Sequence, residues 1–442
     1  MNIRVVNRAV VALGGLLAFV LTPSISHSMP NFARKYDKNC SMCHTQVPKL
    51  NRTGFEFRLA GYRTPDEIGE KESDFDLADF FAARIQAQNE YKKHDDVNPA
   101  KNTSSDQLTF YEATLYPLTG SWGRYFGSLV ELSMAPGEGF EVENAYVRGV
   151  WGDQNGFFTG KIGVMHPQEG FGASDRVIGN VRPLFQKQPA NPGSPFYLWN
   201  VDEMAVEAGY YWVKPGTNIS GRISNGVIWK VDSNGTIGDH ADPAQGGALT
   251  KTLSEPASNH KNWQVVLNQY LSKDSGFTVY YYQGVIPYPD TSANAAPYTE
   301  DKFSRLAVYA NWYALPKTLN LQAGWEDGKD TLDDPNINLA GALSGTAATQ
   351  NSTKVGKSGG YFAALEWYPI DGKLAFGARY DDFDPSKNVN HNTQKAWALS
   401  ANYHPVDNLQ VIADFVRKTT EAGASAGENK DEQLLIRMIC IF

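Results

Sequence analysis

The segment Trp397-Ala398-Leu399-Ser400-Ala401-Asn402-Tyr403-His404 alternates large or apolar side chains with small or polar ones at a period of two. This period places successive side chains on opposite faces of a β-strand. The same alternation recurs at 305–312, 319–326 and 373–380. The sequence therefore predicts an all-β fold of strands with one apolar face, and the alternation alone leaves open whether that face points inward or outward.

The connections between the strands favour a membrane barrel. Sixteen strands are predicted, at 79–91, 106–117, 123–134, 139–151, 155–165, 200–213, 217–230, 261–272, 275–286, 303–314, 318–327, 358–369, 373–382, 394–405, 408–418 and 431–442. Most connections after odd-numbered strands are long and those after even-numbered strands are short; Met134 to Phe140 is a short exception. An outer-membrane barrel has an even strand number, tight periplasmic turns and long outer loops. We therefore predict a sixteen-stranded outer-membrane β-barrel over residues 76–442, with a soluble sandwich as the alternative.

The composition of the chain is typical of an ordered protein. The chain has 442 residues, a net charge of −8 and 42% hydrophobic residues. It has no basic cluster that would neutralise a phosphate backbone, so we expect no nucleic-acid partner.

Residues 1–28 combine Arg4 and Arg8 with a short apolar run and small residues, as a secretory signal peptide does. The last predicted strand carries an apolar stripe that suits contact with lipid and includes Cys440, read as a hydrophobe.

A haem-attachment motif follows the predicted signal peptide. Cys40-Ser41-Met42-Cys43-His44 is C-x-x-C-H, in which Cys40 and Cys43 would bind one haem c covalently and His44 would ligate its iron. A zinc half-site or a redox dithiol is less consistent, because neither a second ligand pair nor a βαβ unit is evident. We therefore expect a monohaem c-type cytochrome domain at 29–75. The distal iron ligand stays open, with Met134, Met165, His166 and His240 as candidates.

The N-terminal motifs resemble a known family. The pattern runs Met29-Pro30-x-Phe32-Ala33-Arg34, then the C-x-x-C-H, then Pro48-x-Leu50-Asn51-x-x-Gly54-x-x-Phe57-x-x-x-Gly61-Tyr62. It is similar to the fused monohaem cytochrome-porins of the bacterial outer membrane, which include extracellular iron oxidases, although residues 60–69 differ from the iron-oxidising members. The resemblance implies a cytochrome domain that plugs the lumen of a sixteen-stranded porin and passes electrons.

Two functions follow as hypotheses. The first is an outer-membrane electron conduit between an extracellular donor, most plausibly Fe(II), and a periplasmic cytochrome c; if it is an enzyme, it is an Fe(II):cytochrome c oxidoreductase. The alternative is a diffusion porin with a haem-containing plug or gate, or a conduit running outward. Acidic loop residues could attract cations or be solvated, and lumenal polar residues could pair with haem propionates or be ordinary wall residues. The acidic residues are Asp95, Asp96, Asp239, Asp242 and those in 327–334; the lumenal ones are Arg84, Gln86, Gln88, Arg222, Arg305 and Arg379.

Overall fold

The computed structural model describes residues 30–70, 77–137, 139–166, 176–186, 203–225, 261–289, 298–332, 355–385, 387, 390–421 and 427–442. The predicted signal peptide at 1–28 and most of the three largest predicted loops, with His240, lie outside these ranges. No helix within them is long and apolar enough to cross a membrane.

Sixteen antiparallel strands form a closed barrel, with one short additional strand in the same sheet. The strands are β3 (Ala82–Asp95), β4 (Thr103–Tyr116), β5 (Gly120–Trp122), β6 (Phe126–Met134), β7 (Phe140–Asp153), β8 (Gly156–Met165), β9 (Glu203–Trp212), β10 (Thr217–Ser224), β11 (Asn262–Tyr270), β12 (Gly276–Pro289), β13 (Tyr298–Leu315), β14 (Leu319–Leu332), β15 (Val355–Ile370), β16 (Leu374–Asp384), β17 (Gln394–Val406), β18 (Leu409–Glu421) and β19 (Glu428–Ile441). Each long strand pairs with the long strands next to it in sequence, the short β5 pairs with β6, and β19 pairs with β3 to close the barrel. The predicted all-β barrel is confirmed.

The third predicted strand, 123–134, needs a correction. Residues 123–125 form a turn in which Gly123 has φ +59°, so the chain reverses between β5 and β6 and the strand begins at Phe126. β6 pairs with β4 over three residues only, at Ala113–Leu115. A glycine with positive φ ends a strand locally, which the surrounding alternation concealed.

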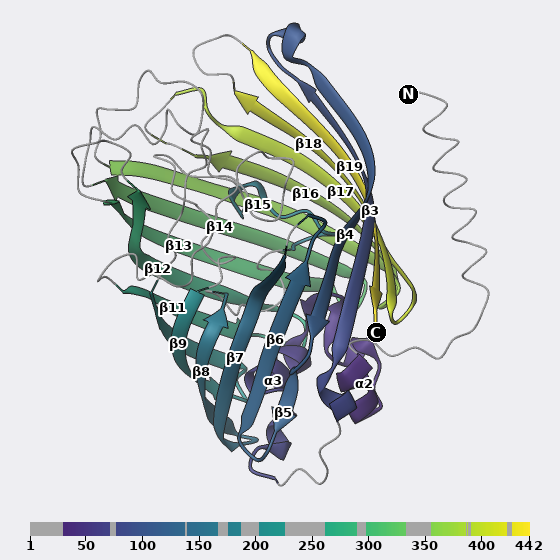
Figure 1. Cartoon of the computed structure of the whole chain (residues 1–442), viewed down its shortest axis with the longest axis vertical. Helices are drawn as coiled ribbons and strands as arrows, with labels where there is room; N and C mark the ends of the chain where they lie inside the picture. The colour runs from purple at the N-terminus through teal and green to yellow at the C-terminus, as the bar shows by residue number, and fades with distance from the viewer. Residues whose placement is uncertain are drawn as a thin grey trace.

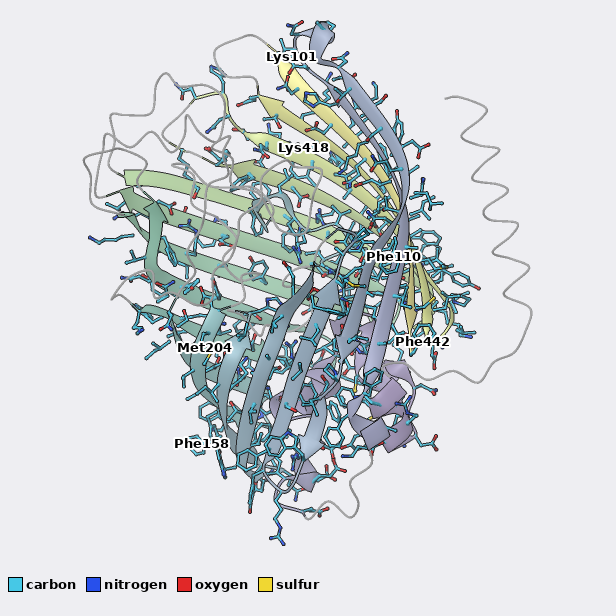
Figure 2. The ribbon with its side chains drawn as sticks, viewed as in Figure 1. Lys101, Phe110, Phe158, Met204, Lys418 and Phe442 are labelled. Atoms are coloured by element: carbon cyan, nitrogen blue, oxygen red, sulfur yellow. The ribbon has the colours of Figure 1, made fainter. Side chains whose placement is uncertain are left out.

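The apolar faces of the strands point outward. On β17, Trp397 and Leu399 are 61% and 54% exposed, whereas Ala398 and Ser400, which alternate with them, are buried. Phe158 on β8 projects from the outer surface in the same way (Figure 2). Apolar outside and polar inside is the arrangement of a barrel in lipid and the reverse of a soluble sandwich, so the sandwich alternative is wrong.

The N-terminal segment lies in the lumen at the end where the short turns are. We call residues 30–70 the plug. It contains α2 (Pro30–Tyr36), η1 (Cys40–Met42), the two-stranded sheet of β1 (His44–Gln46) and β2 (Lys49–Leu50), α3 (Arg52–Leu59) and η2 (Pro65–Glu67); η3 (Leu77–Phe80) leads into β3. Figure 1 shows α2 and α3 at the lower end of the barrel, beside the C-terminus. The plug and the short turns therefore lie at the same end of the barrel.

A second segment enters the lumen between β8 and β9. We call residues 176–186 the lumenal loop, which includes η5 (Leu184–Gln186). Val177, Ile178, Leu184 and Phe185 are buried in one cluster with inward side chains of β11–β17. Arg379 holds the loop from β16, since its two terminal nitrogens donate to the carbonyls of Val181 and Arg182 at 2.6 and 2.9 Å. Among the described residues, the inner wall therefore carries an insert from the chain's beginning and another from its middle.

Candidate functional site

The C-x-x-C-H motif lies on the plug, inside the barrel. Cys40 begins η1, Cys43 follows it, and His44 opens β1. The Nδ1 atom of His44 lies 3.2 Å from the carbonyl oxygen of Pro48. A carbonyl only accepts hydrogen bonds, so this contact requires a proton on Nδ1, which leaves Nε2 as the ring nitrogen that could ligate a metal. A metal-ligating histidine is oriented by such a bond from its other ring nitrogen.

Helix α3 holds the motif in place. Its N-cap residue Asn51 accepts a hydrogen bond from the backbone of Gly54 at 3.0 Å and donates through Nδ2 to the carbonyl of Met42 at 3.0 Å. The backbone nitrogen of Asn51 also donates to the carbonyl of Cys43 at 2.9 Å. A β-carbon on Gly54 would lie 2.1 Å from that carbonyl, so only glycine permits this approach. These contacts hold the loop that bears the C-x-x-C-H motif against α3.

Charged and polar side chains join the plug to the barrel wall. Lys49 forms a buried ion pair with Glu366 on β15, and burial lowers the pKa of Lys49. On the opposite side, Tyr211 of β9 donates to Glu56 at 2.6 Å and Arg148 of β7 donates to the carbonyl of Arg58 at 2.6 Å. These contacts reach strands on both sides of the barrel, so the plug is held at several points of the wall.

Aromatic packing adds to the attachment. Phe55 packs against Tyr211 and Tyr270, with ring centroids 6.2 and 5.4 Å apart. Phe57 lies in a second cluster with Tyr146, to which Tyr62 is linked by a hydroxyl–hydroxyl hydrogen bond of 2.8 Å. Both clusters mix plug and barrel residues, so the apolar face of α3 is buried against the wall. A plug this short has little core of its own and depends on that burial.

The structure brings one histidine to His44 that sequence reasoning missed. His404 on β17 is 5% exposed and points into the lumen, and its imidazole lies near enough to that of His44 for the two to interact electrostatically. Its Nε2 atom is buried and has no hydrogen-bond partner among the described residues. The signal was present in the sequence, because the alternation placed His404 on the polar face of its strand, but nothing local connected it to the plug.

The predicted distal candidates are placed differently. Met134 is 36% exposed at the end of β6 and is among the exposed apolar residues. Met165 is fully buried in the cluster of Phe57 and Tyr62, and His166 follows it, with its carbonyl accepting a hydrogen bond from Arg222. None of these three is recorded in contact with His44, and His240 lies outside the described residues.

The lumenal polar residues, which could pair with haem propionates or be ordinary wall residues, have partners on the wall. Arg84 pairs with Glu112 at 2.6 Å, Arg222 with Glu203 at 2.9 Å, Arg305 with Asp330 at 2.7 Å and Arg379 with Asp381 at 2.9 Å, while Gln86 donates to Glu112 and Gln88 accepts from Arg437. These pairs balance charge along the polar inner wall.

The acidic loop residues are likewise dispersed. Asp95 pairs with Lys93 at 2.5 Å, and Asp327 pairs with Lys387 at 2.5 Å. No group of three or more His, Cys, Asp or Glu side chains that could hold a metal ion occurs in the described part of the chain. Asp239, Asp242 and residues 333–334 lie outside it.

Comparison with known proteins agrees with the barrel. Residues 357–442, from β15 to β19, match the family described as phosphate-selective porin O and P. The match, the closed antiparallel barrel and its apolar outer face together decide the class. The chain is an outer-membrane β-barrel whose last strands are similar to that porin family. Because of this similarity we call the barrel of residues 82–441 porin-type; the family match itself is confined to residues 357–442 and does not reach the plug.

Solved porins are similar to this porin-type barrel at low identity. An anion-selective porin from Comamonas acidovorans is 10% identical, with a TM-score of 0.48, over 82% of this chain and 98% of that chain. The outer-membrane channel DcaP of Acinetobacter baumannii is 12% identical, with a TM-score of 0.47, over 82% and 96%. Pseudomonas putida OprB is 10% identical, with a TM-score of 0.47, over 82% and 94%. No curated protein matches the chain.

Proposed function

We propose that this porin-type barrel carries one covalently bound haem c on its lumenal plug and passes electrons between an extracellular redox partner, with Fe(II) as the first donor to test, and a periplasmic cytochrome c. The observation that carries the proposal is the position of Cys40–His44 inside the lumen, with Nδ1 of His44 bonded to the carbonyl of Pro48. Bound there, a haem would supply a one-electron redox centre.

The surroundings of the motif fit a haem. Cys43 and His44 are both half-buried although they lie inside the barrel. The loop that bears them is braced by Asn51 and Gly54. Cys40 and Cys43 would hold the group, and His44 would ligate its iron. The donor set C-x-x-C-H has the chemistry for thioether attachment and imidazole ligation.

The location of the plug supports transfer across the membrane. A free periplasmic domain with one haem could not span an apolar band of about 25 Å, whereas a haem inside the lumen would shorten the distance that electrons must cross. The plug occupies the end with the short turns, where a periplasmic cytochrome c could dock. The opposite end carries the long connections that an external donor or acceptor would meet.

The second candidate is a diffusion porin in which the plug is a gate or a structural element. The family match at 357–442 favours it, because the matching family is named for phosphate-selective porins. Buried lumenal arginines such as Arg305 and Arg379 are consistent with a polar channel wall. This candidate accounts for the barrel better than for the C-x-x-C-H motif.

The test uses the full-length protein expressed with haem c maturation and reconstituted into liposomes that enclose oxidised cytochrome c. Haem-stained gels of the wild type and of C40S/C43S come first, because a wild type without covalent haem ends the proposal. Fe(II) added outside should then reduce the enclosed cytochrome c with the wild type and not with C40S/C43S. Equal reduction by both proteins would show leakage and argue against the conduit. Solute conductance in planar bilayers with a haem that Fe(II) and other external donors leave oxidised would support the diffusion porin.

A further inference from the structure

Two hydrogen bonds position the sheet that begins with His44 against the end of β17 that adjoins the short turns. The side chain of Gln46 donates to the carbonyl of Asn402 at 3.4 Å. Gln410 of β18 donates to both the carbonyl of Val47 and the side chain of Asn402, at 2.9 and 3.0 Å. His44 is two residues from Gln46, and His404 is two residues from Asn402. The bonds therefore hold the two histidines in neighbouring positions.

His404 has an unusual environment for a wall residue. Its backbone nitrogen donates to the carbonyl of Lys373 at 2.7 Å in the normal way of a barrel strand. Its imidazole is 5% exposed, and Nε2 has no partner in the described residues. A buried polar atom without a hydrogen bond costs about 1–3 kcal/mol, so such an atom requires an explanation. A lone pair on Nε2 is also what a metal ligand presents.

We propose that His404 is the distal axial ligand of the haem held by Cys40, Cys43 and His44, so that the barrel itself completes the iron's coordination. The inference rests on the proposed haem plug and goes beyond it, because it assigns a ligand from outside the cytochrome segment. The contact with Pro48 engages Nδ1 of His44. Nε2 of His404 is a buried nitrogen of the wall that has no partner among the described residues, and the two imidazoles are close enough to interact electrostatically. Of the described candidates, Met134 is exposed at the end of β6 and Met165 is packed in an apolar cluster.

A ligand from the wall has a structural consequence. The plug would be joined to the barrel by a coordination bond in addition to the Lys49–Glu366 pair and the aromatic clusters. Haem loading would then lock the plug in the lumen, and the two parts could not separate without a change in the iron's ligands. A haem with two histidine ligands is low-spin, and replacement of one by methionine raises the reduction potential.

The test compares ferric spin state in full-length wild type, H404A and the matched control H166A, which removes another histidine near the lumenal wall. The wild type and H166A should show low-spin electron paramagnetic resonance and optical spectra. H404A should become high-spin, and added imidazole should restore the low-spin form. A wild type that is high-spin, or an H404A that stays low-spin, would overturn the assignment of His404 while leaving the haem plug intact.

A second variant, H404M, keeps the proposal testable if H404A does not fold. H404M keeps a long side chain that can ligate iron, and it should raise the haem's reduction potential and give the optical charge-transfer band of methionine ligation. If H404A fails to load haem, the H404M variant tests the ligand role instead. A reduction potential and an optical spectrum of H404M identical to those of the wild type would refute that role. Absence of covalent haem from the wild type is a separate result, because it refutes the proposed function itself.

Discussion

The plug and the lumenal loop enter the same lumen but are held there by different means. The plug is attached by side chains of its own, such as Lys49 and Phe55, which meet particular partners on the wall. The lumenal loop is held mainly through its backbone, with its carbonyls accepting from Arg379 and Gln322 and the nitrogen of Asn180 donating to Asp414. Its apolar side chains complete a cluster that the strands have largely built.

The difference indicates two roles for inserted segments. Backbone contacts and apolar packing position the lumenal loop, which shapes the lumen. Many different side chains could satisfy such contacts. Specific polar side chains orient a segment whose geometry matters to within a fraction of an ångström, as a ligand-bearing loop requires. Four substitutions test this contrast, ordered by the size of their effect on the plug.

The largest effect is expected from E366Q, which leaves the Lys49 ammonium buried without its carboxylate. Breaking one partner of a buried ion pair costs about 3–5 kcal/mol, so the plug should dock more weakly and be cleaved faster in limited proteolysis within 30–70. Because burial lowers the pKa of Lys49, raising the pH favours its neutral form in the docked plug and should reduce the defect. The double variant K49M/E366Q is the control; cleavage as fast as in E366Q would contradict the buried-charge explanation.

G54A should have the next effect. Its β-carbon meets the carbonyl of Cys43 at 2.1 Å, and steric overpacking of this kind costs about 1–3 kcal/mol. The attachment loop must shift, so covalent haem yield, measured by haem staining against protein amount, should fall. G139A is the control, since no atom lies within 4 Å of that position. Equal haem yields in G54A and G139A would show that the close approach to α3 is unimportant.

N51A removes the N-cap of α3 and the brace on Met42. Loss of an N-cap side chain costs about 0.5–2 kcal/mol. We expect faster proteolysis of the plug than in wild type but slower than in E366Q, with the barrel intact by heat-modifiable gel mobility. N51D keeps the capping oxygen and loses the donor to Met42, so it should fall between N51A and wild type. A plug in N51D as susceptible as in N51A would assign the effect to the brace alone.

The smallest effect on the plug is expected from F185A in the lumenal loop. Phe185 stacks on Phe362 with centroids 5.9 Å apart, and removal of the ring should loosen residues 176–186. Plug docking should change by less than about 0.5 kcal/mol, as for independent sites. Proteolysis rates of both segments, measured in one digest, check this. A comparable loosening of the plug would show that Gln322, which bonds to both Val177 and Glu366, couples the two inserts.

Local sequence patterns were sufficient to predict the barrel and to recognise the C-x-x-C-H motif. The alternation at Trp397–His404 reflects a strand with lipid on one side and a polar lumen on the other, and each strand carries that signal by itself. Cys40, Cys43 and His44 are adjacent in sequence, so their proposed chemistry can be read without the fold. The orientation of the apolar faces needed the structure to decide it.

The features that were missed depend on distant contacts. His404 is an ordinary inward polar residue by its pattern, and only the fold brings it to His44, 360 positions away. The lumenal loop has apolar residues without a helical or strand period, so no pattern marked Phe185 as buried. The turn at Gly123 depended on one backbone angle, which a surrounding apolar alternation does not reveal.

The closure of the barrel sets an order for assembly. Phe442 and Ala83 exchange backbone hydrogen bonds of 2.8 and 3.0 Å, so the last residue of the chain seals the sheet beside the strand that directly follows the plug. Until that seam forms, residues 30–70 have no complete wall to bind. Under the proposed function, a maturation enzyme needs access to Cys40 and Cys43, and the sealed lumen denies it. If that access is needed, thioether formation would precede the final strand pairing.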